Sequence, residues 1–223
     1  MTLEKSTQKK LLKKTLKKTL KKDTKKISIK SILTHGKIIK FANKSVMGRK
    51  VELTDIRKSD YARLVELTGK PNIMKYVGNC KVWDSNKVKK YINYTITDKN
   101  KPINKRDYFS FGIRYGDIFV GIIQFKLLKI CKLLPAKIYK DYPNDVILTI
   151  YIDDKFHGKG IARKAIELLK NKIKLLKPKT HNLFSLVRST NTVMNIAMEK
   201  LNFTFLVEFH NGEYFKLYKT VIQ

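Results

Sequence analysis

Two glycines, Gly158 and Gly160, stand between a run of β-branched and aromatic residues and a stretch with helical spacing. The run, residues 146–152, contains neither Gly nor Pro, which predicts a buried strand. From Ile161 onward, apolar residues recur every three or four positions, which predicts a helix. The first amides of a helix lack internal partners and carry the positive end of its dipole. The sequence therefore predicts that an anionic group such as a phosphate binds at this turn.

The residues around the two glycines suit the same chemistry. A glycine lets an anion approach the backbone with no Cβ in the way, and Lys155, Lys159 and Arg163 add positive charge. A plain strand-to-helix connection in a Lys-rich protein would show the same residues, and it stands as the alternative. No Gly-Lys-Ser/Thr ends the turn, and the glycine spacing differs from that of a dinucleotide fingerprint, so neither of those two phosphate-binding motifs is present.

A family resemblance favours the anion site. The segment His157-Gly158-Lys159-Gly160-Ile161-Ala162 resembles the Gln/Arg-x-x-Gly-x-Gly/Ala turn that follows the fourth strand in the GNAT superfamily of acetyl-CoA-dependent N-acyltransferases. His157 occupies the Gln/Arg position, which departs from the family pattern. The resemblance implies that main-chain amides of residues 157–162, together with Arg163, hold the pyrophosphate of coenzyme A.

A second segment carries the same resemblance. Residues 183–188 read as the next strand, and a helix begins after Ser189-Thr190-Asn191. The family's pattern here is Val-Arg-x-x-Asn-x-x-Ala-x-x-x-Tyr-Glu-Lys-Leu-Gly-Phe. Seven residues match it: Val187, Arg188, Asn191, Glu199, Lys200, Leu201 and Phe203. Asn202 stands where the family has a left-handed glycine cap, and Asn is its usual substitute. The resemblance covers residues 50–220 and implies that Asn191 also contacts the cofactor.

The family's chemistry needs main-chain groups on the central strand. Acetyl transfer requires a neutral amine, a donor for the tetrahedral oxyanion and a proton for the departing thiolate. The resemblance implies that the backbone of Ile150, Tyr151 and Ile152 holds the pantetheine arm and that the Ile152 amide is the oxyanion donor. Because these roles use the backbone, they do not depend on side-chain identity.

The expected acid and base positions hold apolar residues. By the resemblance, the acidic Tyr of many relatives falls at Met198, the Ser of the ribosomal branch near Met194 and the basic Glu of another branch at Leu186. The nearby side chains with an exchangeable proton are His157, Thr149 and Tyr151. An α-amine, with a pKa near ~7.7–8.0, is partly neutral already, whereas a Lys amine near ~10.4 is not. The site therefore favours a protein N-terminus or a weakly basic amine.

The remaining pattern predicts an α/β protein with the GNAT fold. By the resemblance, this is a mixed, mostly antiparallel sheet of six to seven strands, splayed between strands four and five, with helices on both faces. Further expected strands are 51–56 (preferred to 37–41), 109–114, 119–125, 204–209 and 213–218, with hairpin turns at Tyr115-Gly116-Asp117 and His210-Asn211-Gly212. Expected helices are 60–68, with Ser59 as N-cap, and 84–92. Residues 72–77 are expected to form a short turn and 126–144 a loop with some helix or strand, with Cys131 buried.

The layout of residues 60–92 resembles the GNAT branch that acetylates the N-termini of ribosomal proteins. An Asp opens the first helix, as Asp60 does here, and a stretch like Lys75-Tyr76-Val77 precedes the helix that borders the acceptor site. This similarity names a branch but not an acceptor.

Charge predicts the partners. The net charge is +31, which favours coenzyme A, nucleic acid and acidic proteins and disfavours polyamines. Residues 1–35 read as a Lys-rich N-terminal arm, disordered or a lone helix, ahead of one GNAT domain at 36–223. Twelve Lys face two acids within residues 1–30. Docking to RNA, DNA or a ribosome through residues 1–30 and a solvated tail with no specific role are both open.

Cysteine use and hydropathy give the expected compartment. Cys80 and Cys131 form no pairing motif, which favours a reducing compartment and no metal site. No run is apolar enough for a membrane span or a signal peptide, so we expect an intracellular protein, cytoplasmic or nuclear and not secreted.

Two function classes follow. The first is an N-acetyltransferase that moves an acetyl group from acetyl-CoA, without a metal, to a protein N-terminus or small amine by direct attack in a ternary complex. The alternative, suggested by the apolar acid and base positions, is a catalytically weak or inactive GNAT-fold protein that binds acyl-CoA or associates with nucleic acid.

Overall fold

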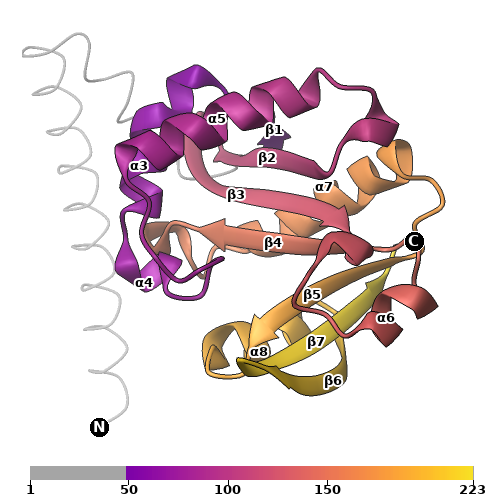
Figure 1. Cartoon of the computed structure of the whole chain (residues 1–223). Helices are drawn as coiled ribbons and strands as arrows, with labels where there is room; N and C mark the ends of the chain where they lie inside the picture. Colours follow the sequence, from indigo (N-terminus) through magenta and orange to yellow (C-terminus); the bar gives the residue numbers. More distant parts are fainter. Residues whose placement is uncertain (1–48, 223) are drawn as a thin grey trace, which may run out of the picture. The chain divides into compact units, whose positions relative to one another are not determined.

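A seven-stranded sheet runs through residues 49–222, the part of the chain that the computed structural model describes (Figure 1). Its strand order is β1-β2-β3-β4-β5-β7-β6. Neighbouring strands are antiparallel except β4 and β5, which are parallel. This confirms the predicted mixed, mostly antiparallel sheet. The predicted Lys-rich arm and the alternative strand at 37–41 lie outside the described residues.

The strands follow the predicted apolar runs closely. They are β1 (Val51–Thr54), β2 (Tyr108–Tyr115), β3 (Ile118–Leu127), β4 (Val146–Ile152), β5 (Asn182–Arg188), β6 (Thr204–Asn211) and β7 (Glu213–Val221). The predicted hairpin turns at Gly116 and Gly212 are confirmed, and both glycines have positive φ.

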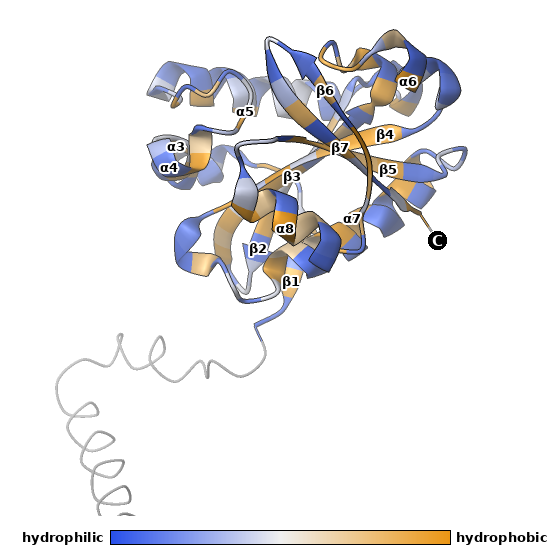
Figure 2. Cartoon of the chain, turned by 90° about the horizontal axis from the view of Figure 1, so that it is seen from below, coloured by the Kyte–Doolittle hydropathy of each residue, from blue (hydrophilic) through white to orange (hydrophobic). Residues whose placement is uncertain are grey.

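The helices form two layers. They are α3 (Tyr61–Thr68), α4 (Pro71–Met74), α5 (Ser85–Lys99), α6 (Ala136–Asp141), α7 (Ile161–Leu176) and α8 (Thr192–Lys200), joined by the 3-10 turns η1 (Lys58–Asp60), η2 (Ile103–Lys105), η3 (Leu128–Ile130) and η4 (Asp154–Phe156). Figures 1 and 2 show α3 to α6 over one face of the sheet and α7 and α8 over the other. Helices on both faces agree with the prediction.

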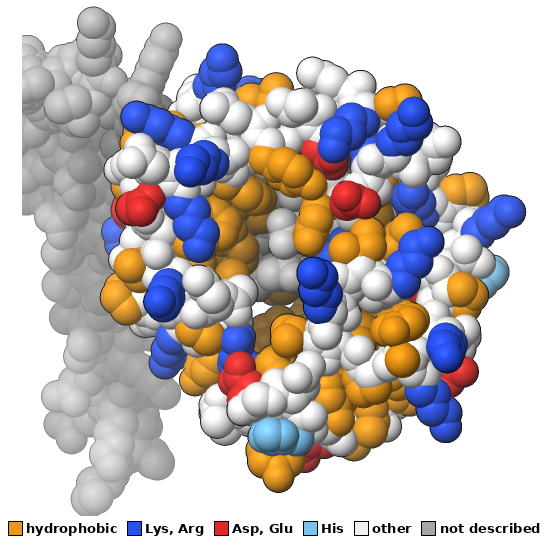
Figure 3. All heavy atoms as spheres, viewed as in Figure 1, with side chains coloured by type: hydrophobic (Ala, Val, Ile, Leu, Met, Phe, Trp, Pro, Cys, Tyr) orange, Lys and Arg blue, Asp and Glu red, His pale blue; other side chains and the backbone are white. Residues whose placement is uncertain are grey.

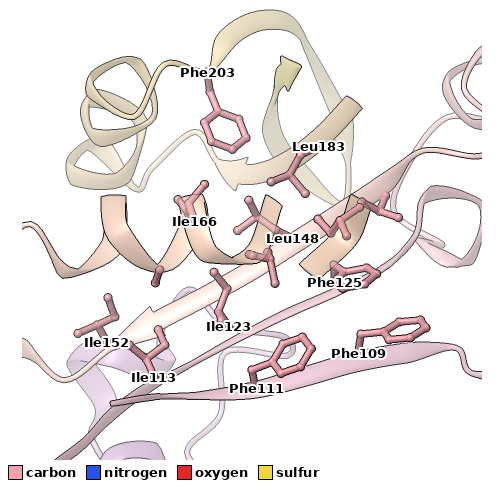
Figure 4. Close-up of a cluster of buried hydrophobic side chains, with 14 of the residues drawn as sticks. Phe109, Phe111, Ile113, Ile123, Phe125, Leu148, Ile152, Ile166, Leu183 and Phe203 are labelled. Atoms are coloured by element: carbon pink, nitrogen blue, oxygen red, sulfur yellow. The ribbon is translucent and has the colours of Figure 1, made fainter. Parts of the chain in front are cut away.

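The largest core cluster, called here the α7-side cluster, fills the space between α7 and the sheet (Figure 4). Phe109 and Phe125 stack in it at a centroid distance of 4.6 Å. Ile166 and Leu169 of α7 point into it at the three-to-four spacing that predicted this helix. The burial of this one helix face against β2, β3 and β4 fixes where α7 begins, beside the end of β4.

On the opposite face the core is divided in two. The α5-side cluster lies under α3 and α5 and includes Tyr151 of β4. The α6-side cluster lies beside α6 and includes Ile147. Thr149, between these two positions on the same face of β4, belongs to neither cluster and is half-buried. The division leaves room above the middle of the sheet.

Two local predictions need correction. Ser59 is not a helix cap, because residues 58–60 form η1 and Asp60 is the N-cap of α3, without a side-chain cap bond. The Asp60 carboxylate instead accepts from Arg57 N at 2.9 Å and from Arg114 Nη2 at 2.6 Å. The expected turn at 72–77 contains the end of α4, which Pro71 starts.

Other local predictions are confirmed. The link 126–144 holds the end of β3, η3 and α6, and Cys131 is buried. Asn202 adopts the left-handed conformation, with φ 61°, after α8. The second predicted helix is present but extends to Lys99, seven residues past the predicted end at 92.

Candidate active site

The central feature of the site is the divergence of two parallel strands. Pairing between β4 and β5 ends at Leu148 and Ser185. Beyond that point β4 stays paired with β3, as far as Ile152, and β5 stays paired with β7. The two facing edges therefore separate while each strand remains fixed from behind. This confirms the predicted splay, and Figure 3 shows a hollow in the middle of this face of the molecule.

Gly121 holds the end of β4 close to β3. A Cβ at Gly121 would lie 2.5 Å from the carbonyl oxygen of Tyr151, closer than side-chain carbons approach such atoms. The next residue along β3 toward its start, Val120, accepts a hydrogen bond from Asp153 N at 2.8 Å. The backbone at 151–153, where the oxyanion donor is predicted, is thus set by main-chain contacts.

Both glycines of the predicted anion-binding turn adopt a left-handed backbone conformation. Gly158 and Gly160 have φ values of 74° and 71°, a region that L-residues rarely adopt. Gly160 is the N-cap of α7, and no side chain caps the helix there. The amides of the first helical turn are therefore left to other partners, as an anion site requires.

The basic side chains at this turn have other partners. Lys159 Nζ lies 4.9 Å from the centroid of the Phe156 ring. Arg163 Nη2 donates to the carbonyl oxygen of Lys200, at the end of α8, at 2.9 Å. Arg163 therefore joins α7 to α8, which the sequence did not predict. The Ile161 side chain is buried in the α7-side cluster, and the Ala162 side chain packs against it. Only the backbone of these two residues is therefore available to a ligand at the turn.

His157 connects the turn to the strand before it. Its Nε2 lies 2.8 Å from the carbonyl oxygen of Ile152. Because a carbonyl oxygen only accepts, Nε2 carries the hydrogen. The imidazole in the family's Gln/Arg position thus fixes the end of β4 against the start of the turn.

The β4 residues face alternate sides of the sheet. Ile150 and Ile152 belong to the α7 side. Tyr151 is 7% exposed on the other side, within the α5-side cluster, and burial raises its pKa well above the ordinary value. Thr149 is half-buried on the same side as Tyr151, next to the divergence. The three candidate proton carriers therefore do not converge on one point, since His157 is directed back to Ile152.

The start of α8 is built from amide side chains. Asn191 Oδ1 caps the helix by accepting from Met194 N at 3.2 Å. Asn195 Nδ2 donates to the carbonyls of Arg188 and Ser189, at 3.2 and 3.1 Å, and its Oδ1 accepts from the buried Tyr218 hydroxyl at 3.0 Å. This network orients the segment between β5 and α8.

The positions expected to hold an acid or a base remain apolar in the fold. Met198 is fully buried and Met194 packs against the α7-side cluster. Leu186 packs against the α6-side cluster. None of these side chains can donate or accept a proton, so proton transfer requires other groups or water.

A buried carboxylate that the sequence analysis did not single out lies directly after β4. Asp153 is 0% exposed and accepts from Arg63 Nη2 at 2.9 Å and from Lys70 Nζ at 2.6 Å. The neighbouring Asp154 accepts from Lys70 Nζ and Asn72 Nδ2, both at 2.8 Å. In a chain with so many basic residues, two adjacent acidic residues at the end of a strand were the sequence feature that could have pointed to this site.

Arg188 fastens the loop after α4 to the end of β5. Its Nη1 donates to the carbonyl of Tyr76 at 2.9 Å and its Nη2 to that of Gly78 at 3.0 Å. Its Nε is paired with Glu213 at 2.7 Å. Because Lys70 is bound to the end of β4, residues 70–78 are attached at both diverging strand ends.

Two other kinds of site are absent from the described residues 49–222. Within residues 49–222, no group of three His, Cys, Asp or Glu side chains is placed to hold a metal ion. In the same range, no helix has the length and apolarity that crossing a membrane requires.

The comparisons agree on one family. Residues 50–204 match the model of the acetyltransferase (GNAT) domain, which is more than half of the chain. No curated protein sequence matches this one.

Solved structures resemble the fold at low identity. A GNAT-family acetyltransferase from Bacillus anthracis is 17% identical, with a TM-score of 0.58 over 78% of this chain and 95% of the other. An acetyltransferase from Salmonella typhimurium that modifies the N-terminal serine of ribosomal protein L7/L12 is 14% identical, with a TM-score of 0.61 over 79% and 97%. The spermidine N-acetyltransferase of Vibrio cholerae, solved with CoA and spermine, is 16% identical, with a TM-score of 0.57 over 78% and 96%.

Proposed function

The chain belongs to the GNAT acetyltransferase family and uses acetyl-CoA, and from that premise we propose that its acceptor is a protein N-terminus or a small, weakly basic amine. The single observation that supports the position of the reaction is the end of β4–β5 pairing at Leu148 and Ser185, next to an uncapped start of α7. A thioester between the two strands and a diphosphate at the turn would fit this arrangement.

In the proposed reaction the acceptor amine attacks the thioester carbonyl in a ternary complex. The C–N bond forms as the C–S bond breaks, the amine nitrogen loses a proton, and the thiolate takes one up. The main-chain amide of Ile152 is the proposed donor to the oxyanion. The pantetheine arm would pair with the backbone of residues 150–152, whose edge toward β5 is unpaired.

The proposed pyrophosphate contacts are the main-chain amides of residues 157–162. Asn191, which caps α8 through Oδ1, keeps its side-chain amide nitrogen for the cofactor. The Arg163 guanidinium already donates to the end of α8 through Nη2, so a contact with the pyrophosphate would use its other N–H groups.

The lack of an acid or a base in the expected positions supports a weakly basic acceptor. Met194, Met198 and Leu186 carry no titratable group. An amine that is partly neutral at physiological pH, such as an N-terminal amine with a pKa near ~7.7–8.0, needs less help than a Lys side chain. Positioning of the two reactants would supply much of the rate.

The same apolar positions favour one second candidate. A GNAT-fold protein that binds acyl-CoA without efficient transfer would also show methionines where relatives carry a proton donor. The two candidates differ in turnover and not in cofactor binding.

The N-terminal arm has a separate proposed role. Residues 1–30 carry 12 Lys against two acids, which suits an RNA, DNA or ribosomal surface. Salt-sensitive binding to RNA or DNA that is lost when residues 1–30 are deleted would support this role. Binding that survives the deletion would contradict it.

Two measurements test the enzymatic proposal. Calorimetry with coenzyme A and acetyl-CoA should detect one site per chain, and mass spectrometry of a lysate treated with labelled acetyl-CoA should find labelled N-termini or small amines. Binding without labelled product would favour the inactive candidate. Labelling confined to Lys side chains would contradict the proposed acceptor class.

A further inference from the structure

A row of uncharged polar side chains crosses the middle of the sheet on the face opposite α7. Ser110 of β2 lies beside Gln124 of β3, which lies beside Thr149 of β4. All three side chains are half-buried. Their strand neighbours alternate onto the α7 side. The row therefore ends at the β4–β5 divergence, where pairing stops at Leu148.

Two tyrosines add hydroxyls to this row. Tyr151 lies two residues beyond Thr149 on the same face, and Tyr91 of α5 packs against the cluster that contains it. The Tyr91 hydroxyl is buried and has no hydrogen bond of good geometry among residues 49–222. Burial raises the pKa of Tyr91 to about 12, and hydrogen bonding with Ser110 and then Thr95 opposes this rise. The hydroxyl therefore lies within reach of Ser110 in the row, and a ligand could offer it a better-aligned partner than either side chain does.

Gln124 has a defined orientation in the row. Its Oε1 accepts from Ser110 Oγ at 3.2 Å. Its Nε2 makes no hydrogen bond to any other residue in the described part of the chain. An amide nitrogen carries two donors and no acceptor. In this orientation Gln124 presents donors, which match a carbonyl oxygen and not an ammonium group.

The charge around the row also discriminates between acceptors. Ser110, Gln124, Thr149 and the two tyrosines are uncharged at neutral pH. The next residue on this face of β3 is Lys126, whose Nζ lies 5.4 Å from the Tyr108 ring centroid. A protonated amine placed here would leave water without gaining a counter-charge from these side chains, which is unfavourable. A neutral amine incurs no such penalty.

We propose that the row Ser110, Gln124 and Thr149, with Tyr91 and Tyr151, binds the acceptor, and that Gln124 donates to the carbonyl next to the reacting amine. The acceptor class is then an α-amino acyl compound, such as a peptide N-terminus or an amino acid amide, and not an alkylamine or a polyamine. This inference rests on the proposed function, because it assumes that the thioester lies at the end of the row.

The test compares two acceptors in the full-length protein. Glycinamide has a carbonyl next to its amine. In 2,2-difluoroethylamine the fluorines lower the basicity of the amine without supplying a carbonyl. The variant Gln124→Met keeps the side-chain length and removes both donors. We expect it to raise KM for glycinamide about ten-fold, the effect of one lost hydrogen bond, with little change for difluoroethylamine or in the Kd for acetyl-CoA.

Controls separate this inference from the proposed function. Asn211→Leu removes an exposed amide that donates to Leu133 O at 3.1 Å, and it should leave both KM values unchanged. If Gln124→Met leaves the glycinamide KM unchanged, or raises both acceptor KM values equally, Gln124 does not bind the carbonyl. The inference then fails, and the proposed function is unaffected. If the wild-type protein binds acetyl-CoA but acetylates no amine, the proposed function fails as well.

Discussion

The imidazole of His157 donates from Nε2 to the carbonyl oxygen of Ile152 at 2.8 Å. This bond spans the segment between the strand that is proposed to hold the thioester and the turn that is proposed to hold the diphosphate. It gives a structural reason for a histidine where relatives carry Gln or Arg, because each of these side chains can donate to the same carbonyl. We therefore propose that His157 is a positioning residue and not the proton donor to the thiolate.

Substitutions of His157 should weaken cofactor binding only where they remove the N–H donor to Ile152. His157→Leu should raise the Kd for coenzyme A by up to about ten-fold, the upper range for one hydrogen bond. His157→Gln retains an N–H donor and should bind nearly as well as the wild type. Calorimetry measures both. His210→Leu, at an exposed position on β6, is the matched control, and equal affinity of His157→Leu and wild type would exclude the positioning role.

The glycine turn allows a comparison at constant backbone strain. Gly158, Gly160 and Gly212 all have positive φ, and an added Cβ would meet nothing within 4 Å at any of them. Alanine should lower the free energy of unfolding by about 1–2 kcal/mol at each position. Only Gly158→Ala and Gly160→Ala should also weaken coenzyme A binding, because only there does the Cβ face the proposed diphosphate. Equal loss of affinity in Gly212→Ala would mean that strain alone is responsible. Urea unfolding and calorimetry supply the two measurements.

Stability should depend on pH through Asp154. Hydrogen bonding to Lys70, followed by the contacts with Asp153 and Asn72, lowers the pKa of Asp154 below its ordinary value. A depressed folded-state pKa contributes stability above the unfolded-state pKa, near ~3.9, and the contribution is lost as the pH falls further. The free energy of unfolding should therefore decrease below about pH 4, and the decrease should be shallower in Asp154→Asn. Glu167→Gln, which removes an exposed acid paired with Lys164, serves as control. An unchanged slope in Asp154→Asn would contradict the assignment.

Arg188→Lys should loosen the loop after α4. Lysine keeps the charge but cannot reproduce the fork that contacts the Tyr76 and Gly78 carbonyls and Glu213 together. We expect faster amide hydrogen exchange in residues 75–80, with exchange in α7 unchanged. The control is Lys216→Arg, on the neighbouring strand β7. It tests whether replacing any basic residue on this side by another one speeds hydrogen exchange in residues 75–80. Unchanged exchange at 75–80 would mean that the loop is held by other contacts.

Much of the fold was readable from local pattern. Apolar runs without Gly or Pro gave the strands, three-to-four spacing gave α7, and Gly116 and Gly212 gave the hairpin turns, because each of these signals depends on a few neighbouring residues. Errors arose where a distant contact decided the local structure. Ser59 is a good N-cap residue by type, but the Asp60 carboxylate is bound to Arg114, 54 positions away.

The family and the strand–turn–helix unit at 146–176 could be recognised from the sequence, since both depend on patterns within short segments. The tertiary structure alone decided which side chains meet. It brought Asp153 to Arg63 and Lys70, fastened Arg188 to the loop at 76–78, and aligned Ser110, Gln124 and Thr149 from three strands. The physical reason is that strand register and helix packing set contacts between residues far apart in the chain, and no local periodicity records them.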